Sequence, residues 1–209
     1  MSVDWITLAL GGCAIACAVG VWSLTRPTNE PRRAVDHYEG LVRRNPNDYA
    51  SRYELALAYM RRGQLMESIA ELRTVVELAP KHAPAHYSLG VALLTSGNHT
   101  AALSHLERAT SLSPIYADAH ASLGALHHMR GDATAAKAAL IRATSLDPTL
   151  AIAHFNLARC YAQEHNVDKT IECLRAAIKQ DPAMRAEAKC GNDFDHLMGD
   201  EKFRQFMFA

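Results

Sequence analysis

The sequence predicts an all-α protein built as a helical solenoid, and three observations support this. Five prolines recur every 34 residues, at Pro46, Pro80, Pro114, Pro148 and Pro182. When each proline is counted as position 32 of its unit, position 7 is always leucine, position 8 is alanine or glycine, and position 24 is again leucine. Within each unit, apolar residues fall at helical spacing in two halves. Such a period is typical of solenoids, in which each unit buries its apolar face against its neighbours.

The helix boundaries inside each unit follow from local signals. Position 15, where the first helix should end, is glycine in three units, at Gly63, Gly97 and Gly131. Glycine adopts the left-handed conformation of a helix C-terminus at little cost, and His165, in the fourth unit, is a residue type enriched at positive φ. The second helices should be capped by the polar side chains of Asn98, Asp132 and Asn166. Each proline then ends the second helix, because it disfavours the α conformation of its predecessor.

The combined columns resemble those of the tetratricopeptide repeat family. The segments "LGVAL" from Leu89 and "LGALH" from Leu123 match its leucine-glycine pair, and Tyr59 and Tyr161 match its aromatic position 11. The resemblance covers four whole units, 49–82, 83–116, 117–150 and 151–184, after a half repeat, so that the solenoid spans 34–184. It implies paired antiparallel helices in a right-handed superhelix. Residues 185–209 are expected to form capping helices, in which Phe194, Leu197, Phe203 and Phe206 cover the last repeat.

The N-terminal segment differs in composition. Residues 5–24 contain no charged side chain, and Trp5 and Trp22 stand near its two ends. A run of about 20 apolar residues is long enough to cross a bilayer, and tryptophan prefers the interfaces. With basic residues only after this segment, we expect a single-pass membrane protein whose repeats are cytoplasmic, by default in a bacterial inner membrane, with a mitochondrial membrane as the alternative. Residues 25–33 would be a linker.

Small residues recur along the expected span at Gly12, Ala16 and Gly20. Such a stripe allows close packing with another transmembrane helix, either a second copy or a partner subunit, although glycine and alanine are also common in such helices. A cleaved secretory signal is an alternative for this segment, but it would need a basic start, and the flank carries Asp4. A lipoprotein site at Cys13 fits less well, because the apolar run continues beyond it.

Composition and motifs exclude several classes of function. The formal net charge is +0, which gives no indication of nucleic-acid binding. The five cysteines form no C-x-x-C pair, and Cys160 and Cys173 are expected as core residues. His86, His120 and His154 share position 4 of successive units, too far apart to converge on one metal ion. No catalytic motif is present, so the sequence predicts no enzyme activity, no metal and no cofactor.

The family resemblance also implies where a partner would bind. In tetratricopeptide arrays, positions 2, 5, 9, 12 and 13 of the first helix line the concave face. Carried over to this chain, that face is expected to include Tyr53, Leu57, Met60, Arg61, Tyr87, Val91, Leu94, His128, Met129, Phe155 and Arg159. Tyr53, Tyr87 and Phe155 are its main candidates. Such a surface suits an amphipathic helix or an extended apolar segment, unless the chain's own half repeat or tail covers part of it.

In the family's chaperone-binding members, a lysine and an asparagine at positions 5 and 9 bind a C-terminal carboxylate. This chain has Tyr53 and Leu57 at those positions of its first unit, so binding of this kind is not expected. The sequence therefore predicts a membrane-anchored, non-enzymatic scaffold that recruits or positions a protein partner while a membrane complex is assembled or stabilised. A permanent structural subunit of a membrane complex is the first alternative, and a metal protein or enzyme is the second.

Overall fold

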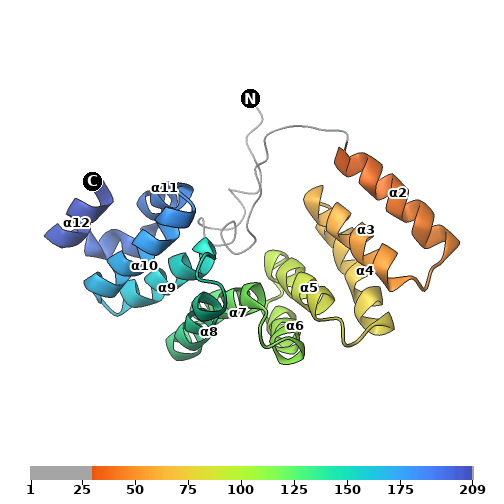
Figure 1. The fold of residues 1–209 in the computed structure, drawn as a ribbon, viewed down its shortest axis with the longest axis horizontal. Helices are drawn as coiled ribbons and strands as arrows, with labels where there is room; N and C mark the ends of the chain where they lie inside the picture. Colours follow the sequence, from red (N-terminus) through yellow and green to blue (C-terminus); the bar gives the residue numbers. More distant parts are fainter. Residues whose placement is uncertain (1–29, 209) are drawn as a thin grey trace. The chain divides into compact units, whose positions relative to one another are not determined.

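The computed structural model describes residues 30–208, and every regular element in that range is helical. The described chain divides into two compact units, residues 30–115 and 116–208. Figure 1 shows the first unit in orange to light green and the second in darker green to blue. The all-helical prediction is confirmed for this part of the chain.

The first unit contains five helices joined by short turns. They are α2 (Glu30–Arg44), α3 (Tyr49–Arg61), α4 (Leu65–Leu78), α5 (Ala83–Thr95) and α6 (His99–Leu112). Helix α2 packs on α3, α3 pairs with α4, and α5 pairs with α6 (Figure 1). At the α2–α3 contact, Tyr59 donates a hydrogen bond of 2.8 Å to Glu39. Burial and this bond raise the pKa of Tyr59 to about 12, so the phenol stays neutral and α2 remains fastened to the first repeat.

The second unit contains two helix pairs and a C-terminal segment. The pairs are α7 (Ala117–Met129) with α8 (Ala133–Leu146), and α9 (Ala151–Gln163) with α10 (Val167–Gln180). The C-terminal segment consists of α11 (Ala183–Cys190), the short 3₁₀ helix η2 (Asn192–Leu197) and α12 (Glu201–Phe208). Helix α11 and η2 contact each other, η2 lies against α9, and α12 lies against α10.

The predicted turn chemistry is confirmed. The three glycines at position 15 have φ of 72°, 82° and 80°, and His165 has the left-handed φ of 55°. The side chains of Asn98, Asp132 and Asn166 each accept a hydrogen bond from the backbone N–H three residues later, as helix caps. The C-cap of each second helix is the residue before its proline, and it has an extended or other non-helical conformation. These local signals fix the 34-residue period.

Small residues at positions 8 and 20 let the helices of each pair approach closely. A Cβ atom added to Gly90 would lie 2.8 Å from Cγ of Leu106, and one added to Gly124 would lie 2.5 Å from Cγ of Leu140. Both leucines are fully buried, at position 24 of their units. The glycine column therefore makes room for the leucine of the facing helix.

The C-terminal segment completes the core of the second unit. Phe194, Phe203 and Met207 are 0% exposed and belong to one apolar cluster with residues of α9 and α10, including Phe155 and Leu174. The rings of Phe194 and Phe203 stack with centroids 6.1 Å apart. The free thiols of Cys160 and Cys173 are buried in the same cluster. Phe194, Leu197 and Phe203 are thus buried in this cluster, whereas Phe206, the fourth residue expected there, is only partly buried against it.

The predicted membrane localisation has to be corrected. No helix within residues 30–208 is long and apolar enough to cross a bilayer. The longest, α2, has 15 residues, about 22 Å at the helical rise against a hydrocarbon core of about 30 Å. The assignment of a single-pass protein with cytoplasmic repeats is therefore wrong on this finding. Residues 5–24, with Trp5, Trp22, Gly12, Ala16 and Gly20, lie outside the described residues, as does most of the linker expected at 25–33.

Candidate partner-binding surface

The expected partner-binding residues of the first unit lie on α3 and α5. On α3, Tyr53, Leu57 and Met60 are partly buried, and Arg61 at the end of the helix is exposed. Tyr53, Leu57 and Met60 occupy one side of the helix, because successive members are four and three residues apart, and Arg61 follows Leu57 by four. On α5, Tyr87 is also partly buried. These residues combine apolar area with accessible edges, as a peptide-binding surface requires.

Tyr53 is held in place by contacts to α5 and to the residue that caps it. Its ring meets the His82 ring edge to face at a centroid distance of 5.1 Å, and its hydroxyl lies 3.2 Å from the Ser88 hydroxyl. Burial raises the pKa of Tyr53, so the phenol is neutral at physiological pH. His82 in turn accepts the N–H of Ala85 and caps α5. The ring is thus presented in a fixed orientation.

Two other expected residues of α5 are not on the surface. Val91 is 3% exposed and Leu94 is 1% exposed, so both belong to the core. Helix α5 is apolar on most of its circumference, and ten of its 13 residues are buried. A helix that is apolar all round is buried, and position within the repeat alone did not reveal this. The accessible surface of the first unit therefore rests on Tyr53, Leu57, Met60, Arg61 and Tyr87.

In the second unit, the face of α9 is already covered by the chain's own C-terminal segment. Phe155 is 3% exposed, and its ring meets that of Phe194 edge to face at 5.7 Å. The imidazole of His196, in η2, makes a hydrogen bond of 2.7 Å to the carbonyl of Ala162 near the end of α9. The position equivalent to Tyr53 in the fourth repeat is thus filled from within the molecule.

Arg159 anchors the same segment through a buried ion pair. Its Nη2 donates to Oδ1 of Asp193 at 3.0 Å, and its Nε lies 3.0 Å from Oδ2. The contact of Nε is an ion pair only, since this buried nitrogen makes no hydrogen bond. A third bond of 3.2 Å runs from Nη1 to the side-chain oxygen of Asn156. The side chain of Arg159 is 8% exposed and that of Asp193 is 35% exposed, so Asp193 is the counter-ion of a nearly enclosed guanidinium.

The two expected residues of α7, His128 and Met129, are neighbours in sequence, and the charges of this ion pair act on His128. His128 is 9% exposed, and its Nε2 is buried without a hydrogen-bond partner. Burial lowers the pKa of His128, the charge of Arg159 lowers it further, and Asp193 acts in the opposite direction. Met129, the last residue of α7, is partly buried. His128 is therefore a neutral side chain next to a buried charge pair.

The structure adds four residues that the repeat columns did not single out, namely His82, Ser88, Asp193 and His196. The first two orient Tyr53, and the last two fasten η2 to α9. A signal for the tail was available, because Asp193 follows Arg159 by 34 residues and His196 follows Ala162 by the same interval. The tail thus contacts α9 at the repeat interval, although its own helices do not form a further repeat.

Nothing within residues 30–208 groups three or more histidine, cysteine, aspartate or glutamate side chains as a metal site would require. The second unit has an open groove of about 270 Å³. It is lined by residues of α8, α9 and α10, including Tyr161 and Lys169. The ring of Tyr161 lies under the ammonium groups of Lys137 and Lys169, at 5.9 and 5.0 Å. This groove holds no catalytic arrangement.

Comparisons with known proteins agree with this architecture. Two family profiles described as tetratricopeptide repeat match the sequence, one at residues 28–83 and 53–114 and the other at 93–149 and 128–189. Together they span more than half of the chain. No curated protein sequence matches it.

Several solved structures share the fold. A crystal structure of MamA is 25% identical and superposes with a TM-score of 0.66, covering 74% of this chain and 91% of MamA. YrrB, described as a tetratricopeptide repeat protein with an unusual peptide-binding site, is 20% identical with a TM-score of 0.65, covering 83% and 88%. TTC0263 from Thermus thermophilus is 21% identical with a TM-score of 0.63, covering 94% and 98%.

Proposed function

We propose, from the fact that this chain belongs to the tetratricopeptide repeat family, that it binds a segment of another protein on the first-unit surface of Tyr53, Leu57, Met60, Arg61 and Tyr87. The family fold is a non-enzymatic protein-interaction fold, so the chain works by binding. We further propose that this binding positions the partner while a protein complex is assembled.

One observation carries the choice of surface. Position 5 is aromatic in the first, second and fourth repeats, but only in the fourth is the ring covered by the chain's own tail, with Phe155 under Phe194. Tyr53 and Tyr87 keep partial exposure. Aromatic rings held rigidly give large contact area at low entropic cost, which is why they are frequent binding hot spots. YrrB, a protein of the same fold, has a peptide-binding site, which supports binding of a protein segment here.

The charge at one end of this surface indicates the chemistry of the partner segment. Arg61 and Arg62 are exposed at the end of α3, and neither side chain pairs with a residue of the described chain. An apolar segment carrying an acidic residue beyond its apolar part fits this arrangement. Exposed charges of this kind act mainly on the association rate and on specificity.

The test is affinity purification of the full-length protein, with co-purifying proteins identified by mass spectrometry. We expect Tyr53→Ala/Tyr87→Ala to lose a specific partner that the unmodified protein retains. Met66→Ala/Ile115→Ala is the matched control, since these side chains are 70% and 75% exposed outside the proposed surface. Circular dichroism checks that all variants are folded. A partner that stays with the tyrosine variant would refute the assignment of this surface.

The same experiment separates the assembly role from the alternative of a permanent structural subunit. A permanent subunit co-purifies in constant proportion with its whole complex, because large apolar interfaces dissociate slowly. A factor that acts during assembly is substoichiometric or is found with incomplete complexes. Quantitative mass spectrometry of the purified material distinguishes the two.

A further inference from the structure

One contact recurs at the start of the first helix in three of the repeats. The side chain at position 4 donates a hydrogen bond to the carbonyl of the proline six residues earlier, which belongs to the preceding repeat. Arg52 makes this bond to Pro46 at 2.6 Å, His86 to Pro80 at 3.2 Å and His154 to Pro148 at 3.0 Å. The side chain at position 4 therefore fastens the turn between two repeats to the helix that follows the turn.

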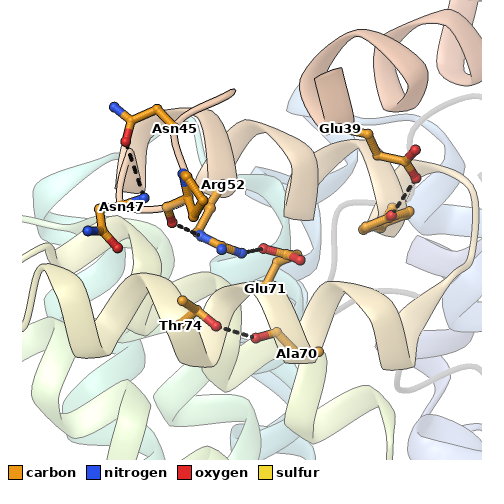
Figure 2. Close-up of polar contacts among 9 residues, drawn as sticks. Glu39, Asn45, Asn47, Arg52, Ala70, Glu71 and Thr74 are labelled. Carbon is orange, nitrogen blue, oxygen red and sulfur yellow. Dashed lines mark hydrogen bonds and ion pairs between the residues drawn. The ribbon is translucent and has the colours of Figure 1, made fainter. Parts of the chain in front are cut away.

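In the first repeat, this side chain also reaches across to the second helix. Nη1 of Arg52 donates to Oε2 of Glu71 at 2.5 Å, and Glu71 stands at position 23 of the unit, on α4. Figure 2 shows the guanidinium of Arg52 between the backbone carbonyl and the carboxylate of Glu71. This contact is a clasp between the paired helices, formed by a guanidinium and a carboxylate instead of two imidazoles.

In the second repeat, the same two positions hold histidines. His86 is at position 4 on α5 and His105 at position 23 on α6. Their Nδ1 atoms are 3.1 Å apart, and the rings stack at a centroid distance of 5.4 Å and an angle of 30°. An ion pair in the first repeat is thus replaced by an imidazole pair in the second.

The hydrogen bonds determine which protonation states this pair accepts. A carbonyl only accepts, so Nε2 of His86 carries the proton that is donated to Pro80. In the neutral pair, Nδ1 of His86 is then the acceptor and Nδ1 of His105 the donor. A single added proton on Nε2 of His105 leaves this bond in place. A second proton can go only to Nδ1 of His86, where two N–H groups would face each other at 3.1 Å.

Charged or titratable groups on the helices packed around the pair oppose the protonation of His86 and His105. His82 lies on the α5 side, Arg108 comes from α6, and Arg73 comes from α4. From α3, Tyr49 and Tyr53 contact His82 with their rings. Burial lowers the pKa of both His86 and His105, and the neighbouring cations and imidazoles lower both further, while the bond to Pro80 acts in the opposite direction for His86.

We propose that the His86–His105 pair is a pH-sensitive clasp: acidification protonates both imidazoles, separates the two Nδ1 atoms and loosens α5 from α6. A histidine that is less basic in the folded than in the unfolded chain stabilises the fold above the unfolded value of about 6.5. That stability is lost as the pH falls below about 6.5 toward the lowered folded pKa values. The clasp is therefore stable at neutral pH and opens more readily as the pH falls.

The clasp bears on the partner-binding surface through α5. This helix carries Tyr87 next to His86, and its Ser88 contacts the hydroxyl of Tyr53. When α5 loosens from α6, the orientation of both tyrosines is lost, and a partner bound there is released. This last step rests on the proposed function, whereas the opening of the clasp does not.

The first repeat supplies the design of the test. In the full-length variant His86→Arg/His105→Glu, the pair of the first repeat is transferred to the second. Urea unfolding of both proteins is followed at pH 7.5 and 5.5. We expect the unfolding constant of the unmodified protein to rise more than that of the variant, by up to roughly 10-fold for each imidazole, as one proton per histidine in the unfolded state requires. Hydrogen exchange, corrected for intrinsic rates, should show α5 and α6 losing protection at pH 5.5 only in the unmodified protein.

Two further variants keep the test decisive. His105→Gln removes one titrating group and should reduce the difference, even if the transferred ion pair does not fold. His154→Gln removes a position-4 histidine whose counterpart at position 23 is Cys173 instead of a histidine, and it should leave the difference unchanged. Equal pH responses in the unmodified protein and in His105→Gln would overturn the proposal. Release of the co-purified partner at pH 5.5 is measured separately, and the absence of any partner would refute the proposed function while leaving the unfolding result standing.

Discussion

Arg159 and Asp193, 34 residues apart, join the face of α9 to the C-terminal segment through two nitrogen–oxygen contacts of 3.0 Å. The guanidinium is nearly enclosed, whereas the carboxylate keeps about a third of its exposure. The pair therefore fixes the tail over α9, and its loss would leave a nearly enclosed cation without its counter-ion.

Asp193→Ala should destabilise the protein by about 2 kcal/mol, because an unpaired charge would remain in the interior. The value is below that for a fully buried pair, since water reaches Asp193. Urea unfolding measures it. Asp168→Ala, which breaks the exposed pair with Lys202, is the control and should cost less than about 0.5 kcal/mol. Equal effects of the two substitutions would contradict the structural role of Asp193.

Gly124→Ala should destabilise the α7–α8 pair by about 1–3 kcal/mol through overpacking. Its new Cβ would lie 2.5 Å from Cγ of Leu140 and 3.1 Å from the carbonyl oxygen of Ala136. Gly40→Ala in α2 is the matched control, with no atom within 4 Å of the new Cβ. It should stabilise the protein by about 0.5–1 kcal/mol, as expected for an open helical site. Thermal unfolding of both variants measures the two changes in stability, and a stable Gly124→Ala variant would contradict the close approach of α7 and α8.

Gly131→Ala tests the backbone alone. Its φ is 80°, and an added Cβ would meet nothing within 4 Å. Any loss of stability therefore comes from the left-handed conformation, at about 1 kcal/mol. Chemical denaturation measures this loss, and a neutral result would mean that the turn changes conformation when alanine is present.

The thiols should differ sharply in reactivity. Burial raises the pKa of Cys160 to about 11 and that of Cys173 to about 12, whereas Cys190 is exposed. Because the thiolate is the reactive form, we expect rapid labelling of Cys190 alone in a Cys13→Ser/Cys17→Ser variant at pH 8. Cys160 and Cys173 should react only after unfolding. Mass spectrometry of the alkylated protein identifies the sites, and early labelling of Cys173 would show that α10 opens readily.

The sequence predicted the elements whose causes are local. The left-handed turns at Gly63 and His165, and the caps at Asn98 and Asn166, each depend on a few adjacent residues, so a single column of the repeat was sufficient. The position of Phe194 over Phe155 was harder to predict, since it depends on how a non-repeating tail folds back. The repeat columns allow the tail as one occupant of this surface, but they give no sign of its anchoring residue Asp193.

The burial of Leu94 and the pairing of His86 with His105 show a second limit. Repeat position tells which side of a helix a residue occupies, but not how much of that side neighbouring elements cover. Position 4 alone places His86 in a column of separated histidines and does not reveal its partner. Its role depends on two columns together, positions 4 and 23, and on the chemical difference between Arg52–Glu71 and His86–His105.

The bond from position 4 to the preceding proline carbonyl has a consequence for engineering with this chain. A module cut at residue 83 would separate His86 from Pro80 and leave its imidazole without the acceptor it has in the native fold. A cut placed before Pro80 would carry the acceptor along. Recombined or consensus arrays derived from this protein should therefore be spliced on the N-terminal side of each proline, so that every transplanted block brings its own starting turn.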